Sequence, residues 1–220
     1  MTDRRTYGDP CGIARALDLL GERWALLVVR ELLLGPKRFT DLRNGLPGVG
    51  PDVLAQRLRD LARAGIVRRA TLAPPAGSRI YELTERGREL EPVLLALGRW
   101  GSRVPLPRGG PGLGVDAFVV ALKTLFDPAD AAGLSESVEL RLDEQRFHAR
   151  VRGKRLEVVR ASAERPDAII HGDTRSLSAV LWHGRLLSDA RAAGDIRIEG
   201  SRPVFERFMK LFPPPEPSGS

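Results

Sequence analysis

The chain has 220 residues, of which 42% are hydrophobic, enough for one or two domains with buried cores. No apolar run approaches the roughly 18–20 residues of a membrane span, and the N-terminal MTDRRTYGDPCG lacks the apolar segment of a secretory signal. With a single cysteine, which cannot form an internal disulfide, these features predict a cytoplasmic protein without membrane attachment. The net charge of +7 is uneven: residues 1–105 carry +6 and residues 106–220 only +1. This asymmetry predicts a polyanion-binding surface in the N-terminal half.

The first 50 residues read as three helices. A short amphipathic helix is expected over Cys11–Leu20, followed by a Leu- and Val-rich, largely buried helix over Glu22–Leu34. Gly35-Pro36 ends that helix, and a short helical piece follows over Phe39–Asn44. The glycine-rich segment Gly45–Gly50 then predicts a turn into the next helix, which makes a helix-turn-helix pattern.

The stretch Gly50–Gly65, GPDVLAQRLRDLARAG, is the most informative part of the chain. Pro51 suits a first helical residue, and Gly65 suits a left-handed helix end. An apolar stripe is formed by Val53, Leu54, Leu58 and Leu61. The opposite face carries side chains suited to base reading and phosphate binding in a DNA major groove: Asp52, Ala55, Gln56, Arg59 and Arg63. The alternative is an ordinary amphipathic surface helix. The elements next to it in the sequence distinguish a DNA-reading helix from this alternative.

A β-hairpin is predicted directly after this helix, because the apolar period changes from 3.6 to 2. Its strands are Ile66–Leu72 and Ser78–Leu83, joined by a loop over Pro74–Gly77. A hairpin in this place is typical of the wing of a winged helix. Its basic residues are expected to lie along the DNA backbone or minor groove, and they are Arg68, Arg69 and Arg79.

Thr84 is expected to cap a long helix, Glu85–Trp100, which Pro92 should kink or split. This helix has more apolar residues than packing on a small domain requires: Leu90, Val93, Leu94, Leu97 and Trp100. We interpret it, together with the N-terminal helix, as a homodimer interface. The alternative is that both helices pack within one subunit.

The segment Cys11–Gly101 resembles the HxlR family of bacterial winged-helix transcription regulators. The matching pattern includes the opening Cys, the core G-E-R-W-x-L-L-V-V-R-E-L, then G-P-x-R-F-x-D-L, L-x-x-R-L-x-x-L-x-x-x-G and Y-x-L-T-x-x-G-x-E-L. The family opens on Cys-Pro, whereas this chain has Cys11-Gly12. The resemblance implies a MarR-like homodimer that binds two half-sites of double-stranded DNA, with a recognition helix in each major groove. It also implies a repressor or activator rather than an enzyme.

Cys11 has two interpretations. Some members of this family use the N-terminal cysteine as a thiol sensor of oxidants or electrophiles, or to link the two subunits. That chemistry needs a thiolate, which a helix N-terminus favours. The alternative is a small, half-buried residue at a helix start.

The C-terminal half reads as a separate α+β domain, residues 115–212, after a Pro/Gly linker over 102–114 that follows the winged-helix domain of residues 1–101. A helix over 115–126 precedes an antiparallel meander of strands at Val138–Leu142, Phe147–Val151 and Leu156–Arg160. A strand at Ala168–His171 leads into a helix that Thr174 caps. The remaining elements are a short helix at Ser188–Ala193, a strand at Ile196–Glu199, a helix at Pro203–Phe212 and a disordered tail, 213–220.

This half resembles the sterol-carrier-like lipid-binding fold, over about Val115–Phe212. The matching order is a strand ending in a Gly-Asp turn, a helix ending in His-Gly, and Gly-Asp-Ile-x-Ile-x-Gly before a last helix. The resemblance implies a tunnel for a small apolar ligand. Its lining would come from Phe118, Leu122, Leu177, Leu181, Phe205, Phe208 and Met209. The alternative is that these side chains fill the core.

No pattern in the chain points to catalysis or to a cofactor. A glycine-rich phosphate loop and a recognisable nucleophile motif are both missing, and His148, His171 and His183 are too scattered for a metal-ligand motif. The sequence therefore predicts a DNA-binding regulator controlled by an apolar ligand. Three alternatives stay open: thiol sensing through Cys11 with a structural C-terminal half, a structural half without any ligand, and a carrier of hydrophobic metabolites.

Overall fold

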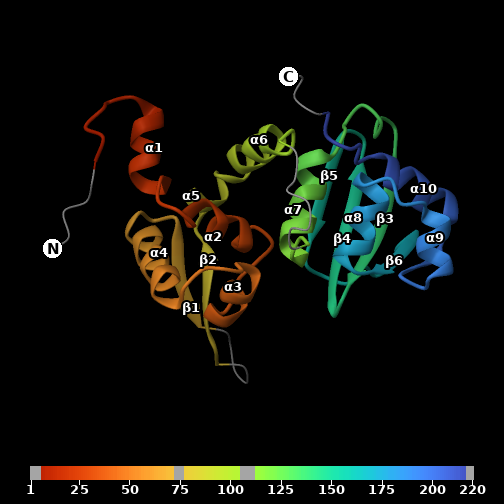
Figure 1. The fold of residues 1–220 in the computed structure, drawn as a ribbon, viewed down its shortest axis with the longest axis horizontal. Coiled ribbons are helices and arrows are strands. Elements are labelled where there is room, and N and C mark those ends of the chain that lie inside the picture. Colours follow the sequence, from red (N-terminus) through yellow and green to blue (C-terminus); the bar gives the residue numbers. More distant parts are fainter. Residues whose placement is uncertain (1–5, 72–76, 105–111, 217–220) are drawn as a thin grey trace. The chain divides into compact units, whose positions relative to one another are not determined.

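The computed structural model describes residues 6–71, 77–104 and 112–216 (Figure 1). The chain divides into two compact units, Met1–Leu94 and Leu95–Ser220. The predicted loop at residues 74–76 and much of the predicted linker and tail lie outside the described residues. No helix in the described ranges combines the length and apolar composition needed to cross a membrane.

The first unit consists of helices around one core, with a two-stranded hairpin. Its elements are α1 (Gly12–Leu20), α2 (Ala25–Leu32), α3 (Phe39–Gly45), α4 (Pro51–Arg63), β1 (Val67–Thr71), β2 (Arg79–Leu83), α5 (Glu85–Arg88) and the start of α6 (Glu91–Gly101). The strands pair antiparallel, with Val67 opposite Leu83 and Thr71 opposite Arg79. The predicted helix-turn-helix followed by a hairpin is confirmed.

The helix α4 begins and ends as its sequence predicts. Gly50 is its N-cap and Pro51 its first residue, and Gly65 after its end adopts a φ of +68°. Its residues Leu54, Leu58 and Leu61 are almost completely buried in the core. The expected place of Val53 in this apolar stripe is wrong, because its side chain is 43% exposed at the edge of the outer face.

The boundaries of α2, α5 and α6 depend on local backbone chemistry. One of them differs from the prediction, and two agree with it. The helix expected over Glu22–Leu34 begins only at Ala25, because Trp24 has a left-handed backbone with a φ of +76°. The cap at Thr84 is confirmed, since its hydroxyl accepts a hydrogen bond from the Gly87 amide at 3.0 Å. The predicted division near Pro92 is also confirmed: α5 ends at Arg88, and α6 restarts with Pro92 in its first turn.

A buried carboxylate joins three elements of the first unit. Glu31 on α2 is almost completely buried, and its oxygens accept hydrogen bonds from Lys37 Nζ at 2.6 Å and Arg30 Nη2 at 2.8 Å. The backbone of Lys37 in turn exchanges two hydrogen bonds with Tyr81 on β2. The oxygen that accepts from Lys37 also lies against Gly45 at the end of α3, where a Cβ atom would overlap it.

The second unit is a five-stranded sheet with helices. Its strand order is β5-β4-β3-β6-β7, and only the β3–β6 pair is parallel. The elements are α7 (Val115–Leu125), β3 (Ser135–Leu142), β4 (Gln145–Arg152), β5 (Arg155–Val159), β6 (Ala168–Gly172), α8 (Thr174–Trp182), α9 (Leu187–Ala192), β7 (Ile196–Gly200) and α10 (Arg202–Lys210). The α+β fold class and the antiparallel β3-β4-β5 meander are confirmed. The cap expected at Thr174 is wrong: the Asp173 carboxylate accepts from Ser176 N instead.

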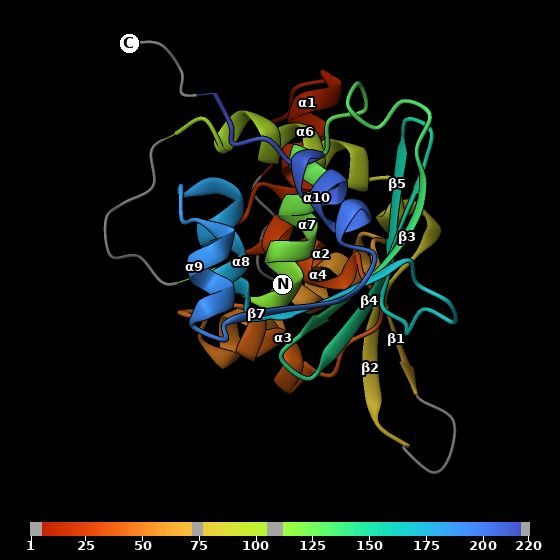
Figure 2. The ribbon, with the colours of Figure 1, turned by 90° about the vertical axis from the view of Figure 1, so that its right-hand side faces the viewer.

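The two faces of this sheet differ in character. Figure 2 shows the helices of the unit on one side of the strands. The strand residues on that side are apolar and buried, among them Val138, Leu140, Phe147, Ala149 and Ile170. Residues of the alternate register make the other side, which is mostly polar. The alternation predicted for the β3–β4 hairpin therefore produces one core face and one open face.

We predict that Gly45→Ala lowers the free energy of unfolding by about 1–3 kcal/mol, because the new methyl group overlaps the clamped Glu31 carboxylate. Gly12→Ala is the matched control, since a Cβ atom there meets open space. Urea unfolding followed by circular dichroism measures both variants. Equal stability of the two would contradict a rigid carboxylate at this site.

Candidate nucleic-acid interface

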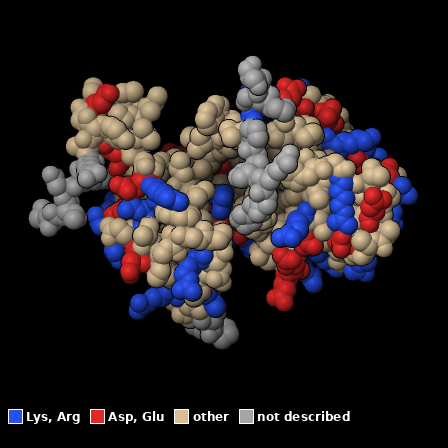
Figure 3. Space-filling model, in the orientation of Figure 1, with Lys and Arg blue, Asp and Glu red and all other residues tan. Residues whose placement is uncertain are grey.

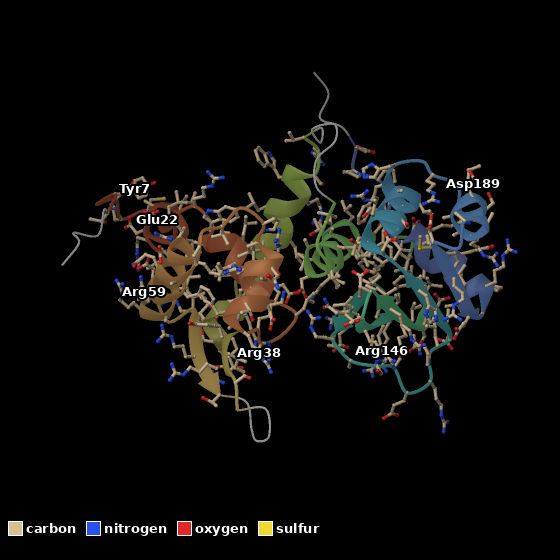
Figure 4. All side chains as sticks on the ribbon, turned by 60° about the horizontal axis from the view of Figure 1, so that its bottom comes forward. Tyr7, Glu22, Arg38, Arg59, Arg146 and Asp189 are labelled. Atoms are coloured by element: carbon tan, nitrogen blue, oxygen red, sulfur yellow. The ribbon has the colours of Figure 1, made fainter. Side chains whose placement is uncertain are left out.

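The outer face of α4 carries the five side chains that the sequence assigns to it. Asp52, Arg59 and Arg63 are exposed, and Ala55 and Gln56 are half-buried. Arg59 extends outward from α4 in Figure 4. The helix thus presents a surface of amide, guanidinium and small side chains, which is the set of groups that reads base edges and binds phosphate in a major groove.

These side chains are linked to one another through Asp60, which sequence reasoning missed. Arg59 Nη2 donates to Gln56 Oε1 at 2.6 Å, and Gln56 Nε2 donates to Asp60 Oδ1 at 2.9 Å. Asp60 also pairs with Arg63 at 3.2 Å and Arg57 at 3.3 Å. The spacing of three or four residues was a visible signal for these contacts. Exposed pairs of this kind contribute only about 0.2–1 kcal/mol each, so DNA can replace them.

Arg57 lies on α4 but differs from the other arginines of the helix. Its side chain is mostly buried, and besides Asp60 it pairs with Glu22, before α2, at 3.5 Å. Its role is to fasten α4 to the preceding chain, which agrees with its absence from the predicted contacts.

The hairpin distributes its three predicted arginines over two faces. Arg69 pairs with Tyr81 and Thr71 with Arg79 in the strand register, so Arg69 and Arg79 share one face. The Arg69 guanidinium lies 5.7 Å from the centre of the Tyr81 ring. Arg68 lies on the opposite face and donates to Glu82 at 2.8 Å. Since Glu82 neutralises Arg68, Arg69 and Arg79 are the better placed pair for phosphate.

Further basic side chains belong to the same unit. Figure 3 shows Lys and Arg gathered over α3, α4 and the hairpin. Arg38 and Arg43, at the start and end of α3, are exposed, and Figure 4 labels Arg38. Sequence reasoning missed both as candidates for phosphate contacts. The signal for them was their place in the first helix of the helix-turn-helix, which lies beside the DNA backbone in this motif.

The two helices predicted to form a dimer interface expose apolar side chains. α1 has no buried residue, and Ile13 is 73% exposed. On α6, Val93, Leu97 and Trp100 are exposed, with Trp100 at 70%. Cys11 is the N-cap of α1 and is exposed, rather than half-buried as its structural alternative expects. Within the described part of the chain, no other element buries these apolar side chains.

The seven predicted ligand-lining residues lie on the helices that cover the sheet. Leu181 and Met209 are half-buried. The others are almost fully buried: Phe118, Leu122, Leu177, Phe205 and Phe208. Phe118 packs against Trp182 at a ring distance of 5.6 Å, and Phe208 against Phe212 at 5.0 Å. The structure thus brings these residues into the core layer, and their part in ligand binding stays a prediction.

The histidines do not come together in the structure. His148 and His171 lie on different strands, β4 and β6, and His183 follows α8. Within the described residues, no group of three or more His, Cys, Asp and Glu side chains has an arrangement that could hold a metal ion.

Comparison with known proteins separates the two units. A family model described as HxlR-like helix-turn-helix matches residues 19–107. An HTH-type transcriptional regulator of Synechocystis sp. is 43% identical over 96 residues, which are 43% of this chain and 70% of the relative. The solved structure of quinone-bound YodB from Bacillus subtilis is 34% identical and covers 42% of this chain and 97% of its own, with a TM-score of 0.37.

A second family model, described as alkyl sulfatase C-terminal, matches residues 113–218. The solved structure of the stereoselective inverting sec-alkylsulfatase Pisa1 from Pseudomonas sp. covers 49% of this chain and 17% of its own, with 19% identity and a TM-score of 0.43. The family model alone makes residues 113–218 similar to an alkyl sulfatase C-terminal domain. The sterol-carrier-like resemblance stays a prediction, because neither match names that fold.

We predict that Arg79→Ala weakens binding to any double-stranded DNA and lowers the slope of log affinity against log salt by about one, because one phosphate contact is lost. Arg68→Ala is the matched control from the other face of the hairpin, where Glu82 already neutralises the charge. Fluorescence anisotropy at several salt concentrations measures both. A larger effect of Arg68→Ala would reverse the assignment of the two faces.

Proposed function

Because the chain belongs to the HxlR-like helix-turn-helix family of transcriptional regulators, we propose that it is a homodimer that binds double-stranded DNA at two half-sites. In this proposal α4 of each subunit enters a major groove and the β1–β2 hairpin follows the backbone. Such a regulator acts on the chromosome, so we expect it in the cytoplasm.

The observation that carries the proposal is the outer face of α4. It presents Gln56, Arg59 and Arg63 as candidates for base and phosphate contacts, with Asp52 and Ala55 at the groove floor. Arg69 and Arg79 extend the basic surface along the hairpin, and Arg68 adds a weaker contact. Base-reading amide and guanidinium groups on a helix, flanked by phosphate-binding arginines, are what sequence-specific binding requires.

The exposed apolar faces of α1 and α6 support the dimer. Ile13, Leu97 and Trp100 would each lose unfavourable contact with water in a subunit interface. A twofold dimer also positions two recognition helices for half-sites one helical turn apart.

We also propose that the second unit binds a small apolar ligand that alters DNA binding. Its similarity to an alkyl sulfatase C-terminal domain and the apolar layer on α7, α8 and α10 support this proposal. A ligand can switch the regulator only if it binds the DNA-bound and free states with different affinity. A pure carrier is less well supported, since a carrier has no need of a basic helix-turn-helix unit.

Thiol sensing through Cys11 is the second candidate, and a specific observation favours it. The Cys11 thiol is exposed at the start of α1, beside the proposed dimer interface. The relative YodB has been solved with quinone bound. In this candidate the second unit is structural, and modification of Cys11 changes how the two subunits pair.

The DNA-reading role of α4 is tested with Arg59→Ala. We expect affinity for a sequence selected from random DNA to fall by about 1–3 kcal/mol, with a much smaller loss on unselected DNA, because a base contact discriminates between sequences. The control is Arg191→Ala on α9, an exposed arginine of the second unit. Equal losses on both DNAs for Arg59→Ala would remove Arg59 from base reading.

The dimer is tested by size-exclusion chromatography with light scattering. Wild type should elute at twice the chain mass of 24.1 kDa, and Trp100→Glu should give a monomer, because a buried charge opposes the interface. Leu186→Glu, at an exposed apolar residue outside the proposed interface, should leave the dimer intact. A monomeric wild type would refute the proposed interface.

The ligand is tested by native mass spectrometry of the purified protein, followed by extraction of any released molecule. We expect a dimer carrying a defined apolar compound, and we expect Leu181→Trp to lose it because the larger ring fills the space. Cys11→Ser should retain it. An empty wild-type dimer whose DNA binding responds to a quinone only when Cys11 is present would favour thiol sensing instead.

A further inference from the structure

The open face of the sheet contains a hollow that the proposed function does not use. Its volume is about 820 Å³, and it lies over β3, β4 and the end of β5, on the side opposite the helices. Its lining is mainly polar: Ser135, Glu136, Ser137, His148, Arg150, Val151, Arg152, Val159, Ala161, Ser162, Glu164, Arg165 and Asp167.

The hollow has a fixed rim because the segment after β5 is fastened to the sheet. Ala163 N donates to the buried Glu139 carboxylate at 2.7 Å. Asp167 N donates to Ser137 O at 2.7 Å, and Ser137 N donates to the Asp167 carboxylate at 2.8 Å. These contacts join the segment to β3 at two points, so the concavity is part of the fold rather than a gap beneath a loose loop.

Three arginines line the hollow without a carboxylate partner among the described residues: Arg150, Arg152 and Arg165. On the same face of the sheet, Arg141 pairs with Glu139 and Arg197 with Glu199. Of the acidic groups in the lining, Glu136 pairs with Arg207, and the Asp167 carboxylate accepts a hydrogen bond from Ser137 N within the hollow. Glu164 and Asp167 line the same hollow, and Glu157 lies opposite Arg150 in the strand register, so the three guanidinium groups have carboxylates nearby but are not held in ion pairs by them.

The floor of the hollow is a buried histidine with a hydroxyl partner. His148 is 7% exposed, and its Nε2 lies 2.7 Å from Ser137 Oγ and 3.3 Å from Arg150 Nε. Burial and then the Arg150 charge lower the pKa of His148, against the weaker opposing effects of Glu139 and Glu157. The neutral ring accepts a hydrogen bond at Nε2 and leaves the outer guanidinium N–H groups of Arg150 free to donate.

We propose that this hollow binds a phosphate group of a small ligand. Phosphate offers several acceptor oxygens that match guanidinium forks, and three arginines without a carboxylate ion pair supply the donors. The concave shape favours a small molecule over the extended backbone of a nucleic acid, which requires a continuous groove. The site is separate from the apolar ligand proposed above, which lies on the helix-covered side of the same sheet.

The experiment observes the histidine imidazole NMR signals of the full-length protein. The chain has three histidines, so the signals are assigned with His→Gln variants. Inorganic phosphate and then pyrophosphate are added at constant pH and ionic strength. We expect a saturable shift of the His148 signal, with smaller effects on His171 and His183. Absence of a saturable His148 shift with both probes would overturn the proposal.

A double variant, Arg152→Gln with Arg165→Gln, tests the arginines without touching His148 directly. We expect its affinity for pyrophosphate to fall at least tenfold. Arg191→Gln, an exposed arginine on α9 outside the hollow, should bind as wild type. Circular dichroism checks that the variants are folded. An unchanged affinity in the double variant, or an equal loss in Arg191→Gln, would contradict binding in the hollow.

DNA is the alternative source of phosphate, and a second arm distinguishes it. If the double variant loses DNA affinity and salt dependence while neither probe shifts His148, the arginines serve the DNA backbone and the small-ligand site is refuted. Unchanged DNA binding with lost pyrophosphate binding supports the proposal. The proposed DNA recognition by α4 is tested separately by the Arg59→Ala variant, and the outcome at the hollow does not affect it.

Discussion

The buried carboxylate of Glu31 is the interaction on which the geometry of the first unit depends. It joins α2 to Lys37, whose backbone pairs with β2, and it lies against Gly45 at the end of α3. A buried charge is tolerated only when it is paired and hydrogen-bonded, so the Lys37 and Arg30 contacts are what allow this carboxylate to lie between the three elements. The same contact therefore fixes the hairpin and the helix-turn-helix relative to each other within the unit.

The recognition surface is built from weak contacts on a rigid support. Leu54, Leu58 and Leu61 bury the inner side of α4, and Arg57 fastens it through Glu22. The outer side chains are held only by exposed hydrogen bonds and ion pairs around Asp60, which cost little to exchange for contacts with DNA. A rigid helix with exchangeable side-chain partners meets two requirements of sequence reading, a defined position and adaptable contacts.

The second unit separates two kinds of chemistry by the alternation of its strands. Residues of one register, such as Leu140 and Phe147, bury the sheet against its helices, and residues of the other register, such as Ser137 and His148, face outward. Without the segment after β5, the outward-facing residues would form an ordinary solvent-exposed surface of the sheet. Tied down by Glu139 and Ser137, that segment converts a flat polar face into a concave one.

The sequence by itself determined the elements of both units and the face of α4 that points away from the core. The signals used were helical spacing, Pro51, Gly65 and the Thr84 cap. Each acts within a few residues, so its effect on structure can be predicted from the sequence. The sequence also indicated the family through Cys11–Gly101. It misplaced Val53 and the start of α2, where a left-handed Trp24 overrides an apolar run.

Only the tertiary structure decided which charges are neutralised and which are free. The pairing of Arg68 with Glu82 depends on strand register, and the presence of Arg165 in the same hollow as Arg150 and Arg152 of β4 depends on a segment folding back over the sheet. Contacts such as Arg68–Glu82 join residues that are distant in the chain, and an arginine has the same appearance in the sequence whether or not a carboxylate lies within 4 Å. Charge compensation is a property of three-dimensional neighbours, and for that reason the sequence does not disclose it.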